Sequence, residues 1–169
     1  LAVDDYTAAI GCNPSHFQAF NNRGMAFREL RRFDEAIADF GSSIALKPDF
    51  ADGYWNKALT HLMVGDYEIG WQLYEHRWDS TNFPSKKRDL GKPLWLGNPS
   101  LNGKTILLHS EQGLGDSLQF CRYIPMVVAR GARVVLESRP ELTRLLAIIP
   151  GVVQCINLDE VVPNCDYQI

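Results

Sequence analysis

The sequence predicts an α + α/β protein, in which helical hairpins precede the beginning of a parallel α/β domain. Small, aromatic and proline residues within residues 1–78 recur at a spacing of about 34 positions, as Pro14 and Pro48 do, and such a spacing is typical of a helical repeat. After residue 104, apolar runs alternate with amphipathic runs of helical spacing. This alternation indicates the strands and helices of a parallel sheet.

Composition and charge exclude several classes of protein. The 169 residues are 46% hydrophobic and 22% charged, which is ordinary for a globular chain. The net charge of -3 gives no electrostatic reason to bind nucleic acid. No apolar run reaches the roughly 18 residues needed to span a bilayer, and the amino terminus has no signal-peptide pattern. We therefore expect no nucleic-acid partner, no membrane span and a cytoplasmic location.

The four cysteines are scattered and form no closely spaced pair. Structural zinc sites usually take cysteines that are paired at short spacings, so we expect neither a metal nor a disulfide. Small hydrophobic side chains in a reducing compartment are the expected role of Cys12, Cys121, Cys155 and Cys165.

The repeated positions resemble the tetratricopeptide repeat, a helix-turn-helix unit with small residues where its two helices cross. The complete unit covers residues 17–50 and matches the repeat at Gly24, Phe27, Ala36, Phe40 and Pro48. Residues 1–16 fit only the second helix of an earlier unit, so we expect the chain to begin inside a repeat. Residues 51–78 form a degenerate third unit, in which Gly70 and Arg77 stand in place of alanines.

The resemblance implies that the repeats bind a partner's extended peptide or helix along their concave face. The alternative is that so short an array only spaces or stabilises the next domain. Within the complete unit, Phe20 stands where the repeat usually has Trp, and Arg23 stands where it usually has Leu. The helical spacing of Trp71, Tyr74 and Trp78 favours a packed core over an aromatic ligand site.

Residues 79–104 are predicted to connect the two parts, because three prolines and several glycines interrupt any regular element. Lys86, Lys87 and Arg88 are interpreted as a solvated surface, with binding of an anionic substrate as the alternative. Trp95 lies between two leucines, and we expect it to anchor the connector on a domain face.

The carboxyl-terminal part is predicted to be the start of an open parallel sheet. Strands are expected at residues 105–110, 133–138 and 152–158, and a fourth begins near residue 165. Right-handed crossovers through two helices should join the first three, and so few helices cannot cover both sheet faces. Pro125 lies inside the first of these helices, where it should kink or divide the helix.

Residues 111–116 follow the first predicted strand and hold the main candidate site. In open parallel sheets, ligands bind beyond the carboxyl ends of strands, where helix amino termini present unpaired N–H groups. Gly113 and Gly115 would let a substrate approach the main chain closely. Asp116 is interpreted either as a cap of the next helix or as a general base for an attacking hydroxyl. His109, at the strand end, is either a substrate contact or a packed neutral side chain.

Binding of a nicotinamide dinucleotide is an alternative function of this loop. Gly113 and Gly115 could open a GxGxxG motif, and Glu137 follows about 20 residues on, where such sites hold an acidic residue. Leu118, however, occupies the third glycine position, and Asp116 would place negative charge beside a pyrophosphate. Both features argue against a dinucleotide.

Three stretches of sequence carry a more specific resemblance: GDYEIGWQLYEHRW, PLWLG and LNGKTILLHSEQGLGDSLQFCRYIPMVVARGARVVLES. They resemble bacterial tetratricopeptide proteins fused to a glycosyltransferase-like domain, which is similar to the ADP-heptose:lipopolysaccharide heptosyltransferases and more distantly to the O-linked N-acetylglucosamine transferases. The resemblance implies a GT-B fold of two Rossmann-like halves, with residues 105–169 at the beginning of the first half. The second half, expected beyond Ile169, would bind the nucleotide-sugar donor, and no tightly bound cofactor is expected.

In those enzymes, a Gly-Asp pair after the first strand carries the carboxylate proposed as catalytic base, and Gly115 and Asp116 match this pair. The resemblance also implies that Gly113 and Gly115 shape the loop near the donor phosphate. The residues before Gly115 differ from the shorter polar residues usual in the heptosyltransferases, so the donor and acceptor stay open. Further candidates for substrate contact are Glu111, Gln112 and Ser117.

Two functions from different classes follow. The first is a fragment of a sugar-nucleotide-dependent glycosyltransferase, whose repeats recruit a protein or peptide partner and whose Asp116 deprotonates the acceptor hydroxyl. By itself such a fragment is expected to be inactive. The second is a non-catalytic scaffold, in which the repeats are an interaction module attached to a degenerate α/β domain. The two glycines and two carboxylates of residues 111–116 favour the enzyme.

Overall fold

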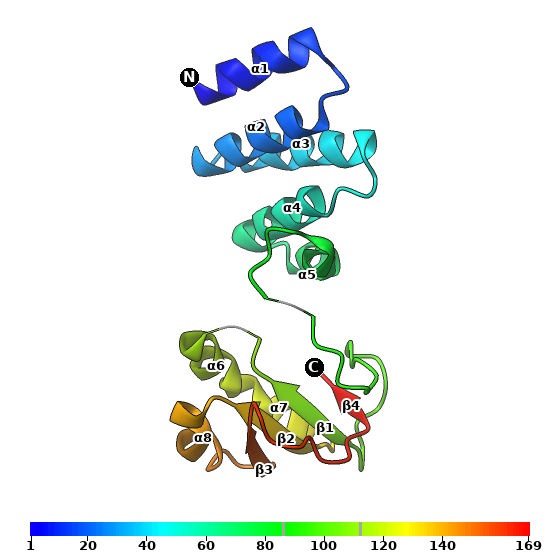
Figure 1. Cartoon of the computed structure of the whole chain (residues 1–169), viewed down its shortest axis with the longest axis vertical. Helices are drawn as coiled ribbons and strands as arrows, with labels where there is room; N and C mark the ends of the chain where they lie inside the picture. The colour runs from blue at the N-terminus through cyan, green and yellow to red at the C-terminus, as the bar shows by residue number, and fades with distance from the viewer. Residues whose placement is uncertain (86, 112) are drawn as a thin grey trace. The chain divides into compact units, whose positions relative to one another are not determined.

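The computed structural model describes residues 1–85, 87–111 and 113–169. The chain forms two compact units, Leu1–Lys86 and Lys87–Ile169 (Figure 1). Each unit has hydrophobic clusters of its own, so the units are described one at a time.

Helices form the regular structure of the first unit across its described residues. They are α1 (Ala2–Cys12), α2 (Phe17–Glu29), α3 (Phe33–Leu46), α4 (Ala51–Val64), α5 (Tyr67–Tyr74) and the 3-10 helix η1 (Glu75–Asp79). Each helix packs against the next one along the chain. Helices α2 and α3 form one hairpin, and α4 and α5 form another (Figure 1). The predicted repeat helices are confirmed.

A glycine allows α2 and α3 to cross closely. Gly24 of α2 lies against the ring of Phe40, and a Cβ on Gly24 would be 2.8 Å from Phe40 Cε1. Phe40 and Ala36 of α3 are fully buried, and Phe27 of α2 completes their cluster. The small residues of the repeat pattern are therefore required by the helix crossing itself.

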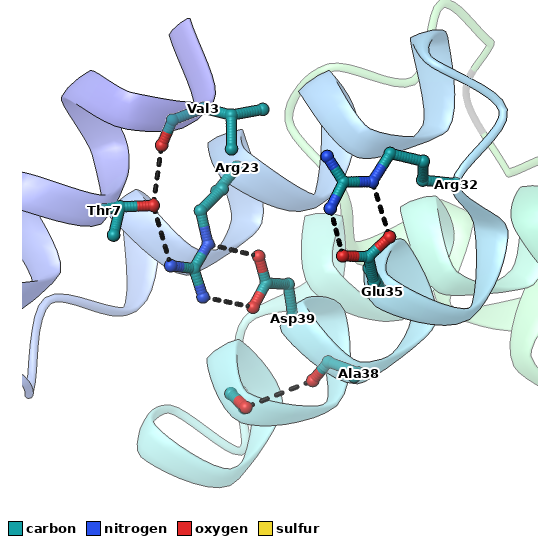
Figure 2. A network of polar contacts seen from close by, with 8 residues as sticks. Val3, Thr7, Arg23, Arg32, Glu35, Ala38 and Asp39 are labelled. Carbon is teal, nitrogen blue, oxygen red and sulfur yellow. Dashed lines mark hydrogen bonds and ion pairs between the residues drawn. The ribbon is translucent and has the colours of Figure 1, made fainter.

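Arg23 joins three helices of the first unit (Figure 2). Its Nε and Nη2 donate to the two carboxylate oxygens of Asp39 in α3, at 2.7 and 2.8 Å. Its Nη1 donates to Thr7 Oγ1 of α1 at 3.1 Å. The hydrogen bonds to Asp39 raise the pKa of Arg23. Where the repeat usually has Leu, this chain therefore has a bidentate ion pair that orients α2 and α3.

The end of the degenerate unit is built around Arg77. Its guanidinium is buried and lies over the rings of Tyr74 and Trp78, at 4.5 and 4.1 Å from their centroids. Phe83 packs edge-on against Trp78, with the ring centroids 5.4 Å apart. The first residues of the predicted connector therefore belong to the first unit.

Trp71 does not lie in this core, and its predicted burial is wrong. Its side chain is 53% exposed, and its ring stands edge-on to that of Tyr74 at 5.6 Å. Helix α5 ends at Tyr74, and the chain continues as η1. A 3-10 helix has three residues per turn instead of 3.6, so Trp78 no longer lies on the helix face that the spacing predicted.

The second unit is a parallel α/β structure. Its elements are β1 (Thr105–His109), α6 (Leu114–Phe120), the 3-10 helix η2 (Cys121–Tyr123), α7 (Ile124–Ala129), β2 (Arg133–Ser138), α8 (Pro140–Leu146), β3 (Val152–Asn157) and β4 (Tyr167–Gln168). Within the described residues, the strands pair in parallel in the order β3-β2-β1-β4. This confirms the predicted parallel sheet.

Helices cover one face of the sheet, and loops cover the other. The helix-side cluster contains Ile106, Val134, Leu136, Ile124, Leu142 and Leu146. The opposite face carries the buried residues Leu107, Val135, Ile156 and Cys165. Leu90 and Val162, which lie outside helices and strands, pack on this second face. The helices alone would leave that face bare, as the sequence predicted, and the two loop segments complete its cover.

The predicted connector, residues 79–104, is divided between the two units. Trp95 is buried in the helix-side cluster of the second unit, and its Nε1 donates to the carbonyl oxygen of Pro99 at 2.9 Å. Leu94 forms a parallel bridge to Gln168 of β4. The expected anchoring by Trp95 is confirmed.

Pro125 divides the first crossover helix, as predicted. Helix α6 ends at Phe120, η2 follows, and α7 begins with Pro125 in its first turn. Proline has no N–H, and the first turn of a helix is the place where this loss is tolerated. In the described ranges, no helix is both long enough and apolar enough to cross a membrane.

Candidate functional site

The predicted loop lies at the carboxyl end of β1, where the strand order reverses. From β1 the chain passes through α6, η2 and α7 to β2 on one side, whereas β4 pairs with β1 on the other side. Open parallel sheets bind ligands at such a switch point. His109 ends β1, and its N–H donates to the carbonyl oxygen of Ile169, next to β4, at 3.0 Å.

Helix α6 begins at Leu114, earlier than the sequence predicted. Gly113 is its N-cap residue, in an extended conformation with φ -84° and ψ 171°. Oδ2 of Asp116, in the first turn, accepts the N–H of Gly113 at 3.0 Å, as the acidic residue of a capping box does. Asp116 therefore caps α6 from inside the helix, and Gly115 belongs to the helix instead of a loop.

Gly115 leaves the main chain open beside an exposed carboxylate. Neither Gly113 nor Gly115 has a left-handed backbone. A Cβ on Gly115 would meet nothing within 4 Å, and one on Gly113 would lie 3.3 Å from Asp116 Oδ2. The side chain of Asp116 is exposed. Packing and backbone conformation therefore do not require a glycine at position 115.

Two serines join the first turn of α6 to the ends of β1 and β2. Ser117 Oγ donates to the carbonyl oxygen of Gly113 at 3.2 Å and shares a 3.0 Å hydrogen bond with Ser110 Oγ. Ser110 Oγ also donates to the carbonyl oxygen of Glu137 at 3.4 Å. Gln112 lies outside the described residues. The structure gathers the other predicted site residues between the end of β1 and the start of α6: His109, Glu111, Gly113, Gly115, Asp116 and Ser117.

Glu137 is held by an arginine from the predicted connector. The Glu137 side chain is 0% exposed, and both its oxygens accept from Arg88, with Nη2 and Oε1 3.0 Å apart. These hydrogen bonds raise the pKa of Arg88. The prediction that Arg88 belongs to a solvated surface is therefore wrong. Because Arg88 holds both oxygens of Glu137, this carboxylate is not free to bind a ribose, as a dinucleotide site would need. The sequence held a signal for this ion pair: Glu137 lies near the end of a buried strand, and a buried carboxylate needs a cation close by.

One ring nitrogen of His109, Nδ1, is buried at this edge of the sheet. Within the described part of the chain, its buried Nδ1 has no hydrogen-bond partner. Burial, and then the positive charge of Arg88, lower the pKa of His109, while Glu137 acts in the opposite direction. These surroundings favour a neutral ring.

A groove of about 880 Å³ opens on the first unit. We call it the α2–α4 groove, because it lies between the carboxyl-terminal halves of these two helices, the first helices of consecutive repeats. Its lining residues are Arg28, Glu29, Arg31, Phe33, Leu59, Leu62 and Met63. The sequence reasoning did not identify this groove. The sequence contained one indication of it: Leu59 and Met63 are four residues apart in α4, and residues at this spacing share one helix face.

Arg28 is a partly buried cation in the α2–α4 groove. Its Nη1 donates to Asn56 Oδ1 at 3.3 Å and lies 3.5 Å from the carbonyl oxygen of the same residue. Burial lowers the pKa of Arg28, and the charge of Glu29 acts in the opposite direction. Among the described residues, no carboxylate forms an ion pair with Arg28.

Comparison with known proteins identifies the repeat. The family model of the tetratricopeptide repeat matches residues 17–50. Protein FlbA of Caulobacter vibrioides is 24% identical over 164 residues, which covers 75% of this chain and 27% of that protein. The Hsp70-Hsp90 organizing protein of Triticum aestivum is 32% identical over 74 residues, covering 44% of this chain and 13% of that protein. The chain thus spans about a quarter or less of the length of these relatives.

Among solved structures, the TPR2B domain of yeast Sti1 in complex with an Hsp70 peptide is similar to this chain. The identity is 31%, the TM-score is 0.43, and the match covers 44% of this chain and 59% of that one.

Proposed function

We propose that this tetratricopeptide-repeat protein binds a partner polypeptide in the α2–α4 groove of its first unit. The groove carries the proposal, because its volume of about 880 Å³ is large enough for several side chains of a partner. The related wheat protein is named as an organiser of Hsp70 and Hsp90, and that task is one of protein binding.

Apolar contact would supply much of the affinity. Leu59, Leu62 and Met63 line one side of the groove, and Met63 is 61% exposed in the free protein. Covering one such side chain with a partner contributes about 1.5–3 kcal/mol. A partner that inserts an apolar side chain between α2 and α4 therefore gains from contacts that the free chain does not make.

We expect Met63→Glu to weaken peptide binding by about tenfold or more, because it places a charge in the apolar part of the groove. The measurement uses peptides selected from a random library on the whole chain and titrated by fluorescence anisotropy. Met126→Glu is the matched control, since Met126 of α7 is 63% exposed and belongs to the second unit. Selected peptides that bind the Met63 variant and the wild type equally would place the binding site elsewhere.

Sugar transfer is a second candidate function, and it belongs to the second unit. The exposed carboxylate of Asp116 at the switch point of the sheet favours it, together with the exposed Gly115 beside it. In this proposal, Asp116 accepts the proton of the acceptor hydroxyl, and Glu111, Ser117 and His109 contact the substrate, as Gln112 would. The donor would be a nucleotide sugar.

We expect Asp116→Asn to lower the rate of sugar transfer by about 10²–10⁴, because an amide cannot accept the proton. The assay uses the longest natural chain that contains residues 1–169 and follows nucleotide release from sugar nucleotides. Asn can still accept the Gly113 N–H, so the melting temperature should change little. Asp159→Asn, at an exposed position of the same unit, is the control. Full activity of the Asp116 variant would leave this carboxylate with its capping role alone.

A further inference from the structure

We propose that residues 80–83, which we call the strap, are a built-in cover of α4 that a partner segment displaces with an aromatic side chain of its own. This inference rests on the proposed binding function of the first unit. It adds how one part of the binding surface is kept closed, and which chemistry a partner needs in order to open it.

The strap and the α2–α4 groove occupy successive parts of one face of α4. Asp52, Trp55 and Leu59 follow one another at intervals of three and four residues, and residues at this spacing share a helix face. Leu59, together with Leu62 and Met63, lines the groove. The strap instead contacts Asp52 and Trp55, in the amino-terminal half of α4.

Phe83 is the buried side chain of the strap. It is 9% exposed, and its ring stands edge-on to the rings of Trp55 and Trp78, with centroid distances of 5.5 and 5.4 Å. Aromatic pairs in this geometry attract one another beyond the effect of the area that they bury. The place between the two indoles is therefore one that accepts an aromatic ring.

Polar contacts join the strap to a single carboxylate. Ser80 Oγ and Asn82 Nδ2 donate to the two carboxylate oxygens of Asp52, and the contact from Asn82 measures 2.6 Å. The strap itself lies outside the helices and strands of the described chain, so it depends on these side-chain contacts. A segment held in this way opens at a lower free energy than a core helix does.

The cover leaves one polar group of α4 unsatisfied. Across the described residues, the buried Nε1 of Trp55 has no hydrogen-bond partner, although a buried indole N–H usually has one. An unpaired buried donor is unfavourable. A partner segment with an aromatic ring between the two indoles and a carbonyl oxygen at Trp55 Nε1 would replace the contacts of Phe83 and add the missing hydrogen bond.

The sequence of the strap predicts the segment that competes with it. The matching ligand has an aromatic residue preceded by side chains that donate hydrogen bonds to a carboxylate, as Ser80, Asn82 and Phe83 are arranged here. Such a segment binds only those molecules whose strap is open. Its apparent affinity for the wild type is reduced by that fraction.

The experiment selects peptides from a random library on the whole chain carrying Phe83→Ala. We expect peptides that require an aromatic residue and that bind this variant at least about tenfold more tightly than the wild type in fluorescence-anisotropy titrations, because the strap no longer competes. Ser80→Ala combined with Asn82→Ala should tighten binding in the same direction without removing a buried side chain. Phe120→Ala is the matched control, since Phe120 is 49% exposed and belongs to the second unit, and it should bind like the wild type.

Two further measurements separate release of the strap from damage to the fold. When a selected peptide binds the wild type, amide hydrogen exchange should accelerate in residues 80–83 and slow in α4. Peptides that depend on Met63 and need no aromatic residue should bind the wild type and Phe83→Ala equally. A variant with a damaged fold would instead lose both kinds of peptide.

The possible failures of the inference and of the binding function differ. The inference is overturned if no peptide selected on Phe83→Ala requires an aromatic residue, if such peptides bind the wild type equally well, or if the exchange of the strap does not respond to them. Peptides that depend on Met63 would then leave the function of the groove standing. An absence of peptides that depend on Met63 would refute that function, and the inference would fall with it.

Discussion

His109 is a titratable side chain in surroundings that favour its neutral form. Its Nδ1 is buried without a partner among the described residues. Burial and the charge of Arg88 lower its pKa in the folded chain, and Glu137 acts in the opposite direction. In the unfolded chain, the ring titrates near the ordinary pKa of about 6.5. Between these two pKa values, the unfolded chain binds the proton and the folded chain does not.

We therefore expect the free energy of unfolding of the second unit to fall as the pH drops below about 6.5. The loss should stop growing once the pH is below the lowered pKa of folded His109. Urea unfolding of the wild type and of His109→Gln, compared from about pH 7.5 to about pH 5, measures the effect. The difference between the two curves isolates this histidine, and identical curves would contradict its lowered pKa.

At the level of elements, the crossing of α2 and α3 depends on the missing side chain of Gly24. A Cβ there would lie 2.8 Å and 2.9 Å from two ring atoms of Phe40, which is fully buried and cannot move aside easily. The glycine lowers the helix propensity of α2. This loss of helix propensity is offset because the close crossing buries Phe40.

We expect Gly24→Ala to destabilise the first unit by up to about 2 kcal/mol. Overpacking costs about 1–3 kcal/mol, and the better helix propensity of Ala returns at most about 1 kcal/mol. Thermal unfolding followed by circular dichroism measures the change. Gly11→Ala in α1 is the control, because a Cβ there meets nothing within 4 Å, and it should stabilise slightly. A Gly24 variant that melts like the Gly11 variant would show that Phe40 can shift.

The elements that the sequence predicted best are those with long, regular patterns. The 34-residue register located α2 and α3 at about the repeat length known for this family, and β-branched runs located β2 and β3. The start of α6 was missed because Gly113 and Gly115 are typical of a loop. The exposure of Trp71 was missed because hydrophobic spacing shows which residues share a helix face and not how much of that face the fold covers.

At the scale of the molecule, the two units have separate cores. The buried clusters of the sheet draw only on residues of the second unit, and the cluster around Phe40 draws only on the first. The ion pair between Arg88 and Glu137 could not be predicted, because the two residues lie far apart in sequence and meet only in the fold. The gathering of His109, Gly113 and Asp116 followed directly from their closeness along the chain.

We expect Leu107→Ala to destabilise the second unit by about 2–5 kcal/mol and to leave the first unit almost unchanged. Leu107 is fully buried between strands, and its truncation leaves a cavity. Amide hydrogen exchange by mass spectrometry resolves the two units. Exchange should accelerate in β1, β2 and β3 but not in α2, α3 or α4. Equal acceleration in both sets of elements would show that the units unfold as one.

The ion pair between Arg88 and Glu137 determines where this protein can be cut for expression. A fragment that starts at residue 105 would contain all the strands of the described residues and yet leave the buried carboxylate of Glu137 without its counter-charge. Breaking a buried ion pair costs about 3–5 kcal/mol, with the lower value more apt here because Arg88 is 33% exposed. The same cut would remove the indole of Trp95 from the core. The second unit is therefore longer than the stretch that holds its helices and strands, because it begins at Lys87.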